Sequence, residues 1–319
     1  MGIEVLYGPW AGNFEKWIKV NGAEIDEVLL SRPMIAPMFL PALRKYCKAP
    51  IVFYGHDIHY LRMEKEAETV KDQTKFNAAQ EMKEFERRVW LSVDHVLYPS
   101  EEEAKTVAEV EPSVHSSAIL PYAFDHVTAR PAPPPSSSEI IFVAGFRHSP
   151  NADGAVWFCK EVFPRIKARH PAAKVILIGT EPPGVVQALA GNDIEVTGYV
   201  SDAELERRYA AARVAVAPLR FGAGVKMKVA EAMVYGIPAV STTVGAQGFE
   251  GLEKIIDVRD DPEAFAEAVI RLLENDTLWV AQSAAQAQYV TRRFSASNMR
   301  DGLEAAFATV TNVPYEAVA

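Results

Sequence analysis

The residues best suited to chemistry lie in the segment 218–236. In order along the chain they are two glycines, two lysines and a glutamate: Gly222, Gly224, Lys226, Lys228 and Glu231. Glycine lets the backbone approach a ligand closely and adopt positive φ. The N-terminus of a helix that begins here favours an anion. The pattern therefore predicts a phosphate site, and Glu231, one turn after Lys228, is placed to accept hydrogen bonds from a ribose diol.

A simpler interpretation of the same segment stays open. A Gly-Ala-Gly turn before a helix is common, and a Lys228–Glu231 pair can be a surface ion pair worth less than about 1 kcal/mol. The rest of the sequence has to decide between the two.

The composition limits the classes of protein. The chain has 319 residues, 49% of them hydrophobic and 24% charged, which is typical of a globular protein with room for two domains. A net charge of −9 without a basic stripe argues against a nucleic-acid binder. Cys47 and Cys159 have no metal-ligand spacing, so neither a disulfide framework nor a zinc site is expected. With no apolar run of membrane-spanning length and no signal segment, we expect a cytoplasmic protein.

A proline- and serine-rich stretch divides the chain. Prolines favour extended backbone and serines add flexibility, so residues 131–138 are predicted to be a linker. We expect one domain over 1–130 and another over 139–295. A last helix over 296–312 is expected to pack back on the first domain.

After the linker, apolar strands alternate with helices. Strands are predicted at 140–146, 174–179, 194–199, 214–219, 238–242 and 255–258, and helices at 153–169, 185–190, 202–212, 262–274 and 278–294. This alternation indicates an α/β, doubly wound domain whose parallel sheet is covered on both faces.

The first half is also α/β. Its predicted strands are Ile3–Tyr7, Glu27–Leu30, Ile51–Tyr54, His95–Tyr98 and Ser117–Leu120. The charged segment Leu61–Leu91 is predicted to form one extended helix, and 33–46 an apolar one.

Several motifs of the second half occur in a familiar order. They are Phe142-Val-Ala-Gly-Phe-Arg147, Asn151, Val175-Ile-Leu-Ile-Gly179, Val196-Thr-Gly-Tyr-Val-Ser-Asp202 and the segment from Pro218 to Gly236. On these motifs the chain resembles the donor-binding domain of glycosyltransferase family 4. The resemblance implies the GT-B fold, in which two Rossmann-like domains face a cleft, and a retaining mechanism.

The resemblance also implies roles for single residues. Glu231 would bind the donor ribose, and Lys226 or the better aligned Lys228 would neutralise the diphosphate together with Arg147. Further donor contacts would come from strand-end and turn positions: Gly145, Gly198, Tyr199, Val200, Gly222, Ala223, Gly224 and Val225. In the first half, Tyr54-Gly-His-Asp-Ile-His59 resembles the family's histidine motif and would place His56 near the transferred sugar. The implied catalytic set is His56, Arg147, Lys228 and Glu231.

Three departures from the family pattern stand out. Ala223 occupies the place of the motif's first glutamate, so sugar recognition would need another group. After Arg147 the chain offers His148 and Asn151 where the family often has lysine. The first half is short, which fits either a compact variant or part of a larger glycosyltransferase.

The expected function is that of a retaining glycosyltransferase in polysaccharide biosynthesis. It would move a sugar from a nucleotide-sugar donor to a glycan or lipid-linked acceptor, with neither a metal nor a further cofactor and without binding nucleic acid. Peripheral contact with the inner face of the membrane through helix 33–46 stays open beside ordinary burial of that helix. Two alternatives remain: a non-catalytic nucleotide-sugar-binding module or domain of a larger glycan-assembly protein, and a GT-B-fold epimerase.

Overall fold

The computed structural model describes residues 4–5, 13–120, 122–124, 126–134, 137–222 and 224–311. The chain forms two compact units. The first unit comprises Met1–Glu64, Asp72–Pro121 and Met299–Ala319, and the second comprises Lys65–Lys71 and Tyr122–Asn298. The chain thus passes from the first unit to the second between Pro121 and Tyr122, ahead of the predicted linker at 131–138.

Four parallel strands form the sheet of the first unit, in the order β1-β2-β3-β4. They are β1 (Val28–Ser31), β2 (Ile51–Tyr54), β3 (His95–Tyr98) and β4 (Ser116–Ala118). The predicted bounds of β2 and β3 are confirmed, and the predictions for β1 and β4 are displaced only slightly. The predicted strand Ile3–Tyr7 lies outside the described residues except for Glu4 and Val5, which belong to no strand.

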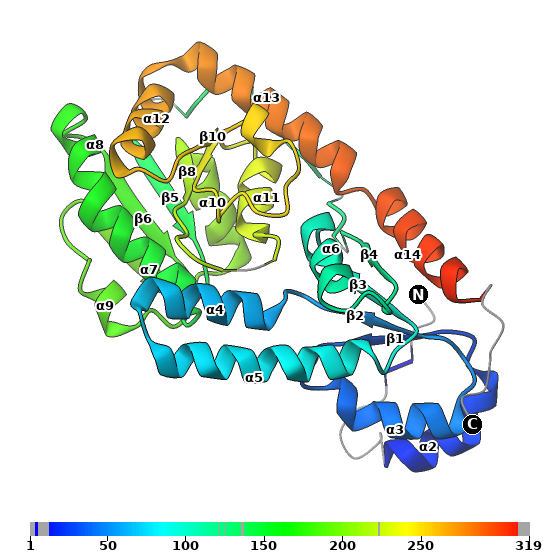
Figure 1. The fold of residues 1–319 in the computed structure, drawn as a ribbon. Helices are drawn as coiled ribbons and strands as arrows, with labels where there is room; N and C mark the ends of the chain where they lie inside the picture. Colours follow the sequence, from blue (N-terminus) through cyan, green and yellow to red (C-terminus); the bar gives the residue numbers. More distant parts are fainter. Residues whose placement is uncertain are drawn as a thin grey trace. The chain divides into compact units, whose positions relative to one another are not determined.

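Helices cover both faces of this sheet (Figure 1). They are α2 (Phe14–Asn21), α3 (Ala36–Tyr46), α4 (His59–Val70), α5 (Gln73–Trp90), α6 (Glu101–Val110) and α14 (Ala296–Thr311). Because side chains alternate along a strand, Ile51 and Phe53 of β2 pack in one apolar cluster. Val52 and Tyr54 lie on the other face, in a cluster completed by Ala306 of α14.

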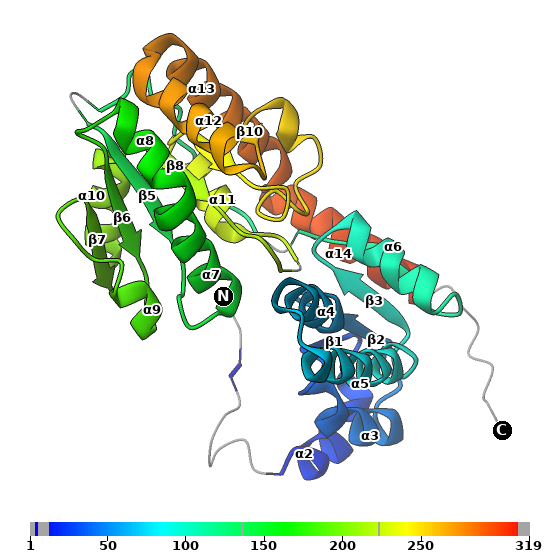
Figure 2. The ribbon, with the colours of Figure 1, turned by 60° about the vertical axis from the view of Figure 1, so that its left-hand side comes forward.

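The prediction of one helix over Leu61–Leu91 is wrong. The chain turns at Lys71, whose φ is 56°, and α5 begins after Asp72. The Asp72 carboxylate accepts hydrogen bonds from the backbone N–H groups of Thr74 and Lys75 and caps the new helix. Helices α4 and α5 lie side by side (Figure 2). They are joined by a hydrogen bond from Gln80 Nε2 to Glu64 Oε1 (2.6 Å).

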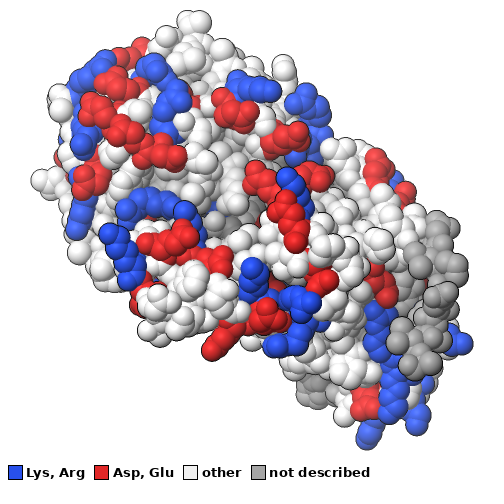
Figure 3. All heavy atoms as spheres, in the orientation of Figure 1, with Lys and Arg blue, Asp and Glu red and all other residues white. Residues whose placement is uncertain are grey.

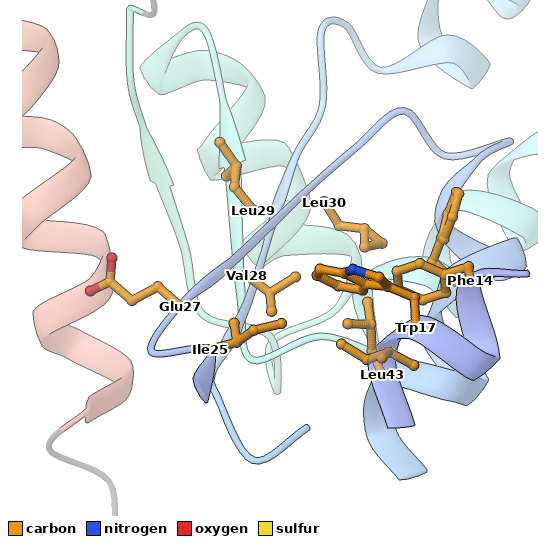
Figure 4. Close-up of a pocket in the computed structure, with 10 residues that line it drawn as sticks. Phe14, Trp17, Ile25, Glu27, Val28, Leu29, Leu30 and Leu43 are labelled. Carbon is orange, nitrogen blue, oxygen red and sulfur yellow. The ribbon is translucent and has the colours of Figure 1, made fainter. Parts of the chain in front are cut away.

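An apolar pocket of about 310 Å³ lies beside the edge strand β1 (Figure 4). It is lined by Phe14, Trp17, Ile18, Ile25, Glu27, Val28, Leu29, Leu30, Phe39 and Leu43. The rings of Phe14 and Trp17 lie over the aliphatic side chains, whereas the Glu27 carboxylate points away from them. No predicted site residue lines this pocket.

Six parallel strands form the sheet of the second unit, in the order β10-β9-β8-β5-β6-β7. They are β5 (Glu139–Val143), β6 (Lys174–Ile178), β7 (Ile194–Gly198), β8 (Val214–Ala217), β9 (Ala239–Ser241) and β10 (Asp257–Val258). From β5 the chain adds β6 and β7 on one side and then returns to place β8 on the other. The strand order therefore reverses between β5 and β8, which is where doubly wound sheets bind ligands.

The helices of the second unit cover both faces of its sheet (Figures 1 and 2). They are α7 (Ser149–Trp157), α8 (Phe163–Arg169), α9 (Gly184–Gln187), α10 (Asp202–Ala211), α11 (Met227–Val234), α12 (Pro262–Glu274) and α13 (Asp276–Arg293). The predicted bounds of α12 are confirmed. The helix predicted from Asp153 begins earlier, at Ser149, with Pro150 in its first turn, and a π-helical turn over Phe158–Val162 joins α7 to α8.

The residues just before the predicted linker are bound to the second unit. The Arg130 N–H donates to Ser283 Oγ (3.0 Å), and its guanidinium donates to the carbonyls of Tyr235 (2.8 Å) and Ala210 (3.1 Å). Gly236 is required here because a Cβ would lie 2.4 Å from the Thr128 carbonyl oxygen. Thr128 and Arg130 are therefore fixed to the second unit.

Acidic and basic side chains mix over the face shown in Figure 3, with Lys and Arg gathered where α2 and α3 lie. None of the helices in the described part of the chain combines the length and the apolar character that crossing a bilayer requires.

Candidate functional site

Two loops meet where the strand order of the second unit reverses. One follows β5 and contains Gly145, and the other follows β8 and contains Gly222. Gly154 of α7 brings them together, because its missing Cβ would lie only 2.7 Å from the Pro218 carbonyl oxygen. The motifs from two distant parts of the sequence thus form one site.

Asn151 holds the loop after β5. Its Nδ2 donates to the Gly145 carbonyl (2.8 Å), and the residue is only 5% exposed. Its buried Oδ1 has no hydrogen-bond partner within the described residues. A Cβ on Gly145 would meet only Thr180 Oγ1, at 3.8 Å, so there is open space above the end of β5.

The glycine turn after β8 has the backbone that the sequence predicts. Gly222 has φ 142° and Gly224 has φ 73°, conformations that disfavour residues with a Cβ. Helix α11 begins at Met227, so Lys226 is its N-cap residue and Lys228 lies in its first turn. Ala223 is outside the described residues, and Val225 is half-buried.

The two lysines have different environments. Lys226 is 7% exposed, and its Nζ donates to the Gly224 carbonyl (2.5 Å), which ties the turn to the start of the helix. Lys228 is half-buried, and burial lowers the pKa of its ammonium to about 8, although the charge of Glu231 opposes this shift. Lys228 is therefore an incompletely neutralised cation in the first turn of α11, suited to an anionic ligand.

Glu231 lies one turn further along α11. Burial raises the pKa of its carboxyl group, and the Lys228 charge opposes that rise. The rings of Tyr209 and Tyr235 stack with centroids 4.4 Å apart and an interplanar angle of 15°. The charge of Glu231 adds to the burial that raises the pKa of Tyr209, so the carboxylate lies close to this aromatic pair.

The remaining predicted donor residues lie at other strand ends. Arg147, after β5, is exposed and pairs with Glu181 (3.6 Å). No hydrogen bond or ion pair joins it to the lysines or glutamate of α11 in the described part of the chain. Gly198 ends β7 with φ 71° and open space where a Cβ would be, and its carbonyl accepts from the Gly179 N–H (3.1 Å). Tyr199 is 76% exposed and Val200 is half-buried.

Arg220 is a cation that the sequence reasoning missed. It directly precedes the glycine turn, and its guanidinium makes a bidentate ion pair with Asp153 of α7. This hydrogen bonding raises the pKa of Arg220. The signal available in the sequence is an arginine at a strand end, two residues before Gly222.

His56 belongs to the first unit. Its Nε2 lies 2.9 Å from Ser31 Oγ, and its ring makes an edge contact with Tyr54, with centroids 4.9 Å apart. Burial, followed by the nearby charge of Arg32, lowers the pKa of the imidazole. The preceding Gly55 is required because a Cβ would lie 2.2 Å from the Tyr98 ring. His56 is therefore held as a mainly neutral imidazole at the carboxyl end of β2.

The other members of the histidine motif have structural partners. His59 Nδ1 contacts Glu86 Oε1 (3.2 Å), and Asp57 pairs with Arg62 (2.9 Å). Within the described residues, no group of three or more His, Cys, Asp or Glu side chains is arranged to hold a metal ion.

Comparisons with known proteins agree with this geometry. Residues 137–275 match the family model described as Glycosyl transferases group 1. A curated relative, an uncharacterized 44.6 kDa protein in the cps region of Klebsiella pneumoniae, is 26% identical over 195 residues, which are 58% of this chain and 48% of the relative. The chain thus spans about half the length of this relative.

Solved glycosyltransferase structures share the fold. TarM of S. aureus superposes with a TM-score of 0.72 at 12% identity, covering 92% of this chain and 57% of TarM. Sucrose-phosphate synthase from Thermosynechococcus elongatus gives a TM-score of 0.72 at 16% identity, over 93% of this chain and 77% of that one. HepE from Anabaena, solved with UDP and glucose, gives 0.63 at 15% identity, over 93% and 80%. Residues 137–275 of the second unit are therefore similar to the glycosyl transferases group 1 domain, and the chain has the GT-B fold.

Proposed function

We propose that this protein is a retaining glycosyltransferase that moves a sugar from a nucleoside diphosphate donor to a glycan or lipid-linked acceptor. The observation that carries the proposal is the Lys228–Glu231 pair on the first turns of α11, beyond the glycine turn. The group 1 match over residues 137–275 supports the donor class. The solved complex of HepE with UDP and glucose supports it as well.

In this proposal Lys228 and the N-terminus of α11 bind the diphosphate. The N–H groups of the first turn receive no side-chain cap within the described residues. Apart from the Val229 N–H, which donates to the Lys226 carbonyl (2.8 Å), they therefore remain available to an anion. As the leaving group departs, negative charge grows on its phosphate oxygens, and a cation fixed at this point stabilises the transition state more than the ground state. Arg147 would add a second cation by exchanging its surface partner Glu181 for phosphate.

Glu231 would accept hydrogen bonds from the ribose hydroxyls. Gly198, Tyr199 and Val200 would lie against the base, where an exposed aromatic ring and open space above the glycine suit a planar group. His56, a mainly neutral imidazole, would hydrogen-bond the transferred sugar. Retention of configuration rests on the family resemblance. Independence from metal rests on the cations that the protein supplies.

The relative from a cps region supports a place in polysaccharide assembly. We place that work in the cytoplasm, where activated sugars are available.

Calorimetry tests the donor site. Titration with UDP, GDP, ADP, dTDP and CMP, each followed by its common sugar conjugates, should give heat for at least one nucleotide. The Lys228→Ala variant should lose most of that heat. Lys65→Ala is the matched control, because Lys65 and Glu68 form a Lys–Glu pair of the same spacing on an exposed surface (3.1 Å). Absence of binding to every nucleotide would overturn the proposal.

Turnover tests the transfer reaction, its independence from metal and its stereochemistry. Release of nucleoside diphosphate from the bound donor sugar, with and without EDTA, should proceed at the same rate if the protein supplies the cations. NMR of the glycosidic product should show the donor's anomeric configuration. Binding of a donor sugar without release across a broad panel of acceptors would indicate a binding module.

A further inference from the structure

Arg32 has an unusual backbone conformation at the carboxyl end of the first unit's sheet. It directly follows β1 and has φ 71°, in the left-handed region that favours glycine. A side chain in that region costs about 1–2 kcal/mol. Such a cost is typical of positions where the side chain has a function.

Hydrogen bonds fix this conformation. The Arg32 N–H donates to the Tyr54 carbonyl (3.4 Å). Its own carbonyl accepts from the N–H groups of Ile35 (3.1 Å) and Ala36 (3.0 Å). The backbone is therefore anchored both to β2 and to the start of α3, and the guanidinium is presented from a rigid base.

The guanidinium itself is exposed, and no ion pair or side-chain hydrogen bond holds it within the part of the chain that the structure describes. Within the described residues no carboxylate lies within ion-pair distance of Arg32. By contrast, Arg44 of α3 makes a bidentate pair with Asp94, at 2.9 and 3.0 Å. An exposed guanidinium on an anchored backbone, without a carboxylate partner within the described residues, is suited to bidentate binding of an oxyanion.

Arg32 lies beside His56. The ring of His56 is bound to Ser31, the residue that precedes Arg32, with 2.9 Å between Nε2 and Oγ. The charged groups that act on this imidazole are Arg32 and His59, which lower its pKa, and Asp57, which raises it. The free cation therefore adjoins the histidine assigned above to the transferred sugar.

Apolar side chains follow Arg32 on the surface. Met34, Ile35 and Met38 are 58%, 41% and 71% exposed. Large apolar side chains left in water next to a lone cation match a ligand that carries a negative group beside an apolar one.

We propose that Arg32 binds a phosphate group carried by the acceptor. This inference rests on the proposed transferase function and names the chemistry of the acceptor side. The phosphate belongs either to a soluble phosphate ester or to the head of a lipid-linked acceptor, and Arg32 recognises the same dianion in both. With the phosphate bound there, the acceptor is held next to His56.

The test uses His56 as a reporter. Imidazole ¹⁵N and ¹H shifts of the whole protein are followed by NMR while inorganic phosphate is added at constant ionic strength. In the wild type, phosphate neutralises the Arg32 charge, so the pKa of His56 should rise with phosphate in a saturable way. In Arg32→Gly that pKa should already be higher without phosphate, and its response to phosphate should fall at least about tenfold.

Arg32→Gly is expected to fold, because glycine prefers φ 71°. Lys71→Gly is the matched control: Lys71 is another cation at positive φ (56°), and it is not among the groups that act on His56. This control should respond to phosphate as the wild type does. An unchanged phosphate response in Arg32→Gly, or no response in the wild type, would overturn the proposal.

Two further arms complete the experiment. Hexyl phosphate, used in place of inorganic phosphate, distinguishes a soluble phosphate ester from a lipid-linked acceptor. If hexyl phosphate binds about tenfold more tightly than inorganic phosphate, the acceptor is lipid-linked. Equal binding assigns a soluble ester. UDP calorimetry on the same samples keeps the proposals apart: UDP binding without a phosphate response defeats only the role of Arg32, whereas absence of UDP binding defeats the transferase function.

Discussion

Helices α4 and α11 each follow a strand of a parallel sheet, and the surroundings of their first-turn N–H groups differ. At α4 the protein supplies its own anions. Glu86 accepts from the N–H groups of His59 (3.0 Å) and Tyr60 (3.0 Å), and Glu103 accepts from Ile58 (3.2 Å). At α11 the N-cap is Lys226, which makes no side-chain cap within the described residues.

The difference separates a closed helix terminus from an open one. Glu86 is fully buried and Glu103 nearly so, so the start of α4 cannot accept an external anion. At α11 the neighbouring side chains of Lys226 and Lys228 are cations, and no side chain among the described residues accepts from the first-turn N–H groups, which favours an external anion. The same element of the fold therefore supports structure in one unit and, in our proposal, donor binding in the other.

The largest effect is expected when the buried carboxylate at the start of α4 is removed. Glu86→Ala removes the acceptor of two backbone N–H groups and the partner of His59, so the free energy of unfolding should fall by about 2–4 kcal/mol. Urea denaturation measures it. Glu84→Ala, an exposed change on the same helix, should stay near the wild type, and an equal loss in both variants would contradict the capping role.

Removing the cation at α11 should act on binding. Lys228→Ala leaves the diphosphate without its charge-assisted partner, which costs about 2–3 kcal/mol, or roughly 30- to 160-fold in nucleoside diphosphate affinity. Calorimetry at pH 7 measures this loss. The corresponding nucleoside should lose much less, and equal losses for the two ligands would make Lys228 a structural residue.

Glu231→Ala should cost about tenfold in affinity for the nucleoside diphosphate, because ribose hydrogen bonds are lost. Inorganic pyrophosphate, which has no ribose, should bind this variant as well as it binds the wild type. A competition assay with both ligands measures whether the variant loses affinity for the nucleoside diphosphate but not for pyrophosphate. Weaker pyrophosphate binding would mean that Glu231 acts by positioning Lys228.

The pH dependence of donor binding follows from Lys228. With its pKa near 8 in the free protein, the lysine is charged at pH 7 and mostly neutral at pH 9. Affinity for the nucleoside diphosphate should therefore fall about tenfold between these values. Lys228→Arg, which stays charged, should remove the dependence. A wild-type affinity that is flat over this range would contradict the assignment.

The smallest expected effect concerns stability without ligand. The pKa of Lys228 is lowered from 10.5 to about 8, so between these pH values the unfolded chain binds more protons than the folded one. The free energy of unfolding should rise across that window. In Lys228→Met, which removes the burial of the charge, stability at pH 7 should rise by about 1 kcal/mol and the slope should flatten. Thermal unfolding at several pH values measures both, and a wild-type slope retained in the variant would assign it to another group.

The central strands could be predicted from sequence because they are apolar runs buried on both faces, as β2 (Ile51–Tyr54) and all but the first residue of β6 (Lys174–Ile178) show. The break at Lys71 could not, since the conformation of one lysine depends on contacts distant in sequence. The N-cap that follows it, Asp72, has a residue type that favours the start of a helix. In the same way, Glu86 lies in a segment that reads as a solvated charged helix, and only the tertiary fold shows that its carboxylate is buried.

For the site, spacing predicted the glycine turn and the helix that carries both lysines, but not how each lysine is oriented. Lys226 and Lys228 are two residues apart, so they point in different directions at the start of α11. One hydrogen-bonds to the turn, and the other remains for a ligand. The ion pair of Arg220 with Asp153 joins residues distant in sequence, so no local sequence pattern predicts it.

Helix α14 has a consequence for how the protein is made. It contributes Ala306 to the cluster that covers Val52, Tyr54 and Leu97, and it follows the whole second unit in sequence. During translation this side of the early sheet stays uncovered until α14 (Ala296–Thr311) has been synthesised. The unit synthesised first is therefore completed last. Nascent chains that lack α14 expose an apolar surface that chaperones can bind.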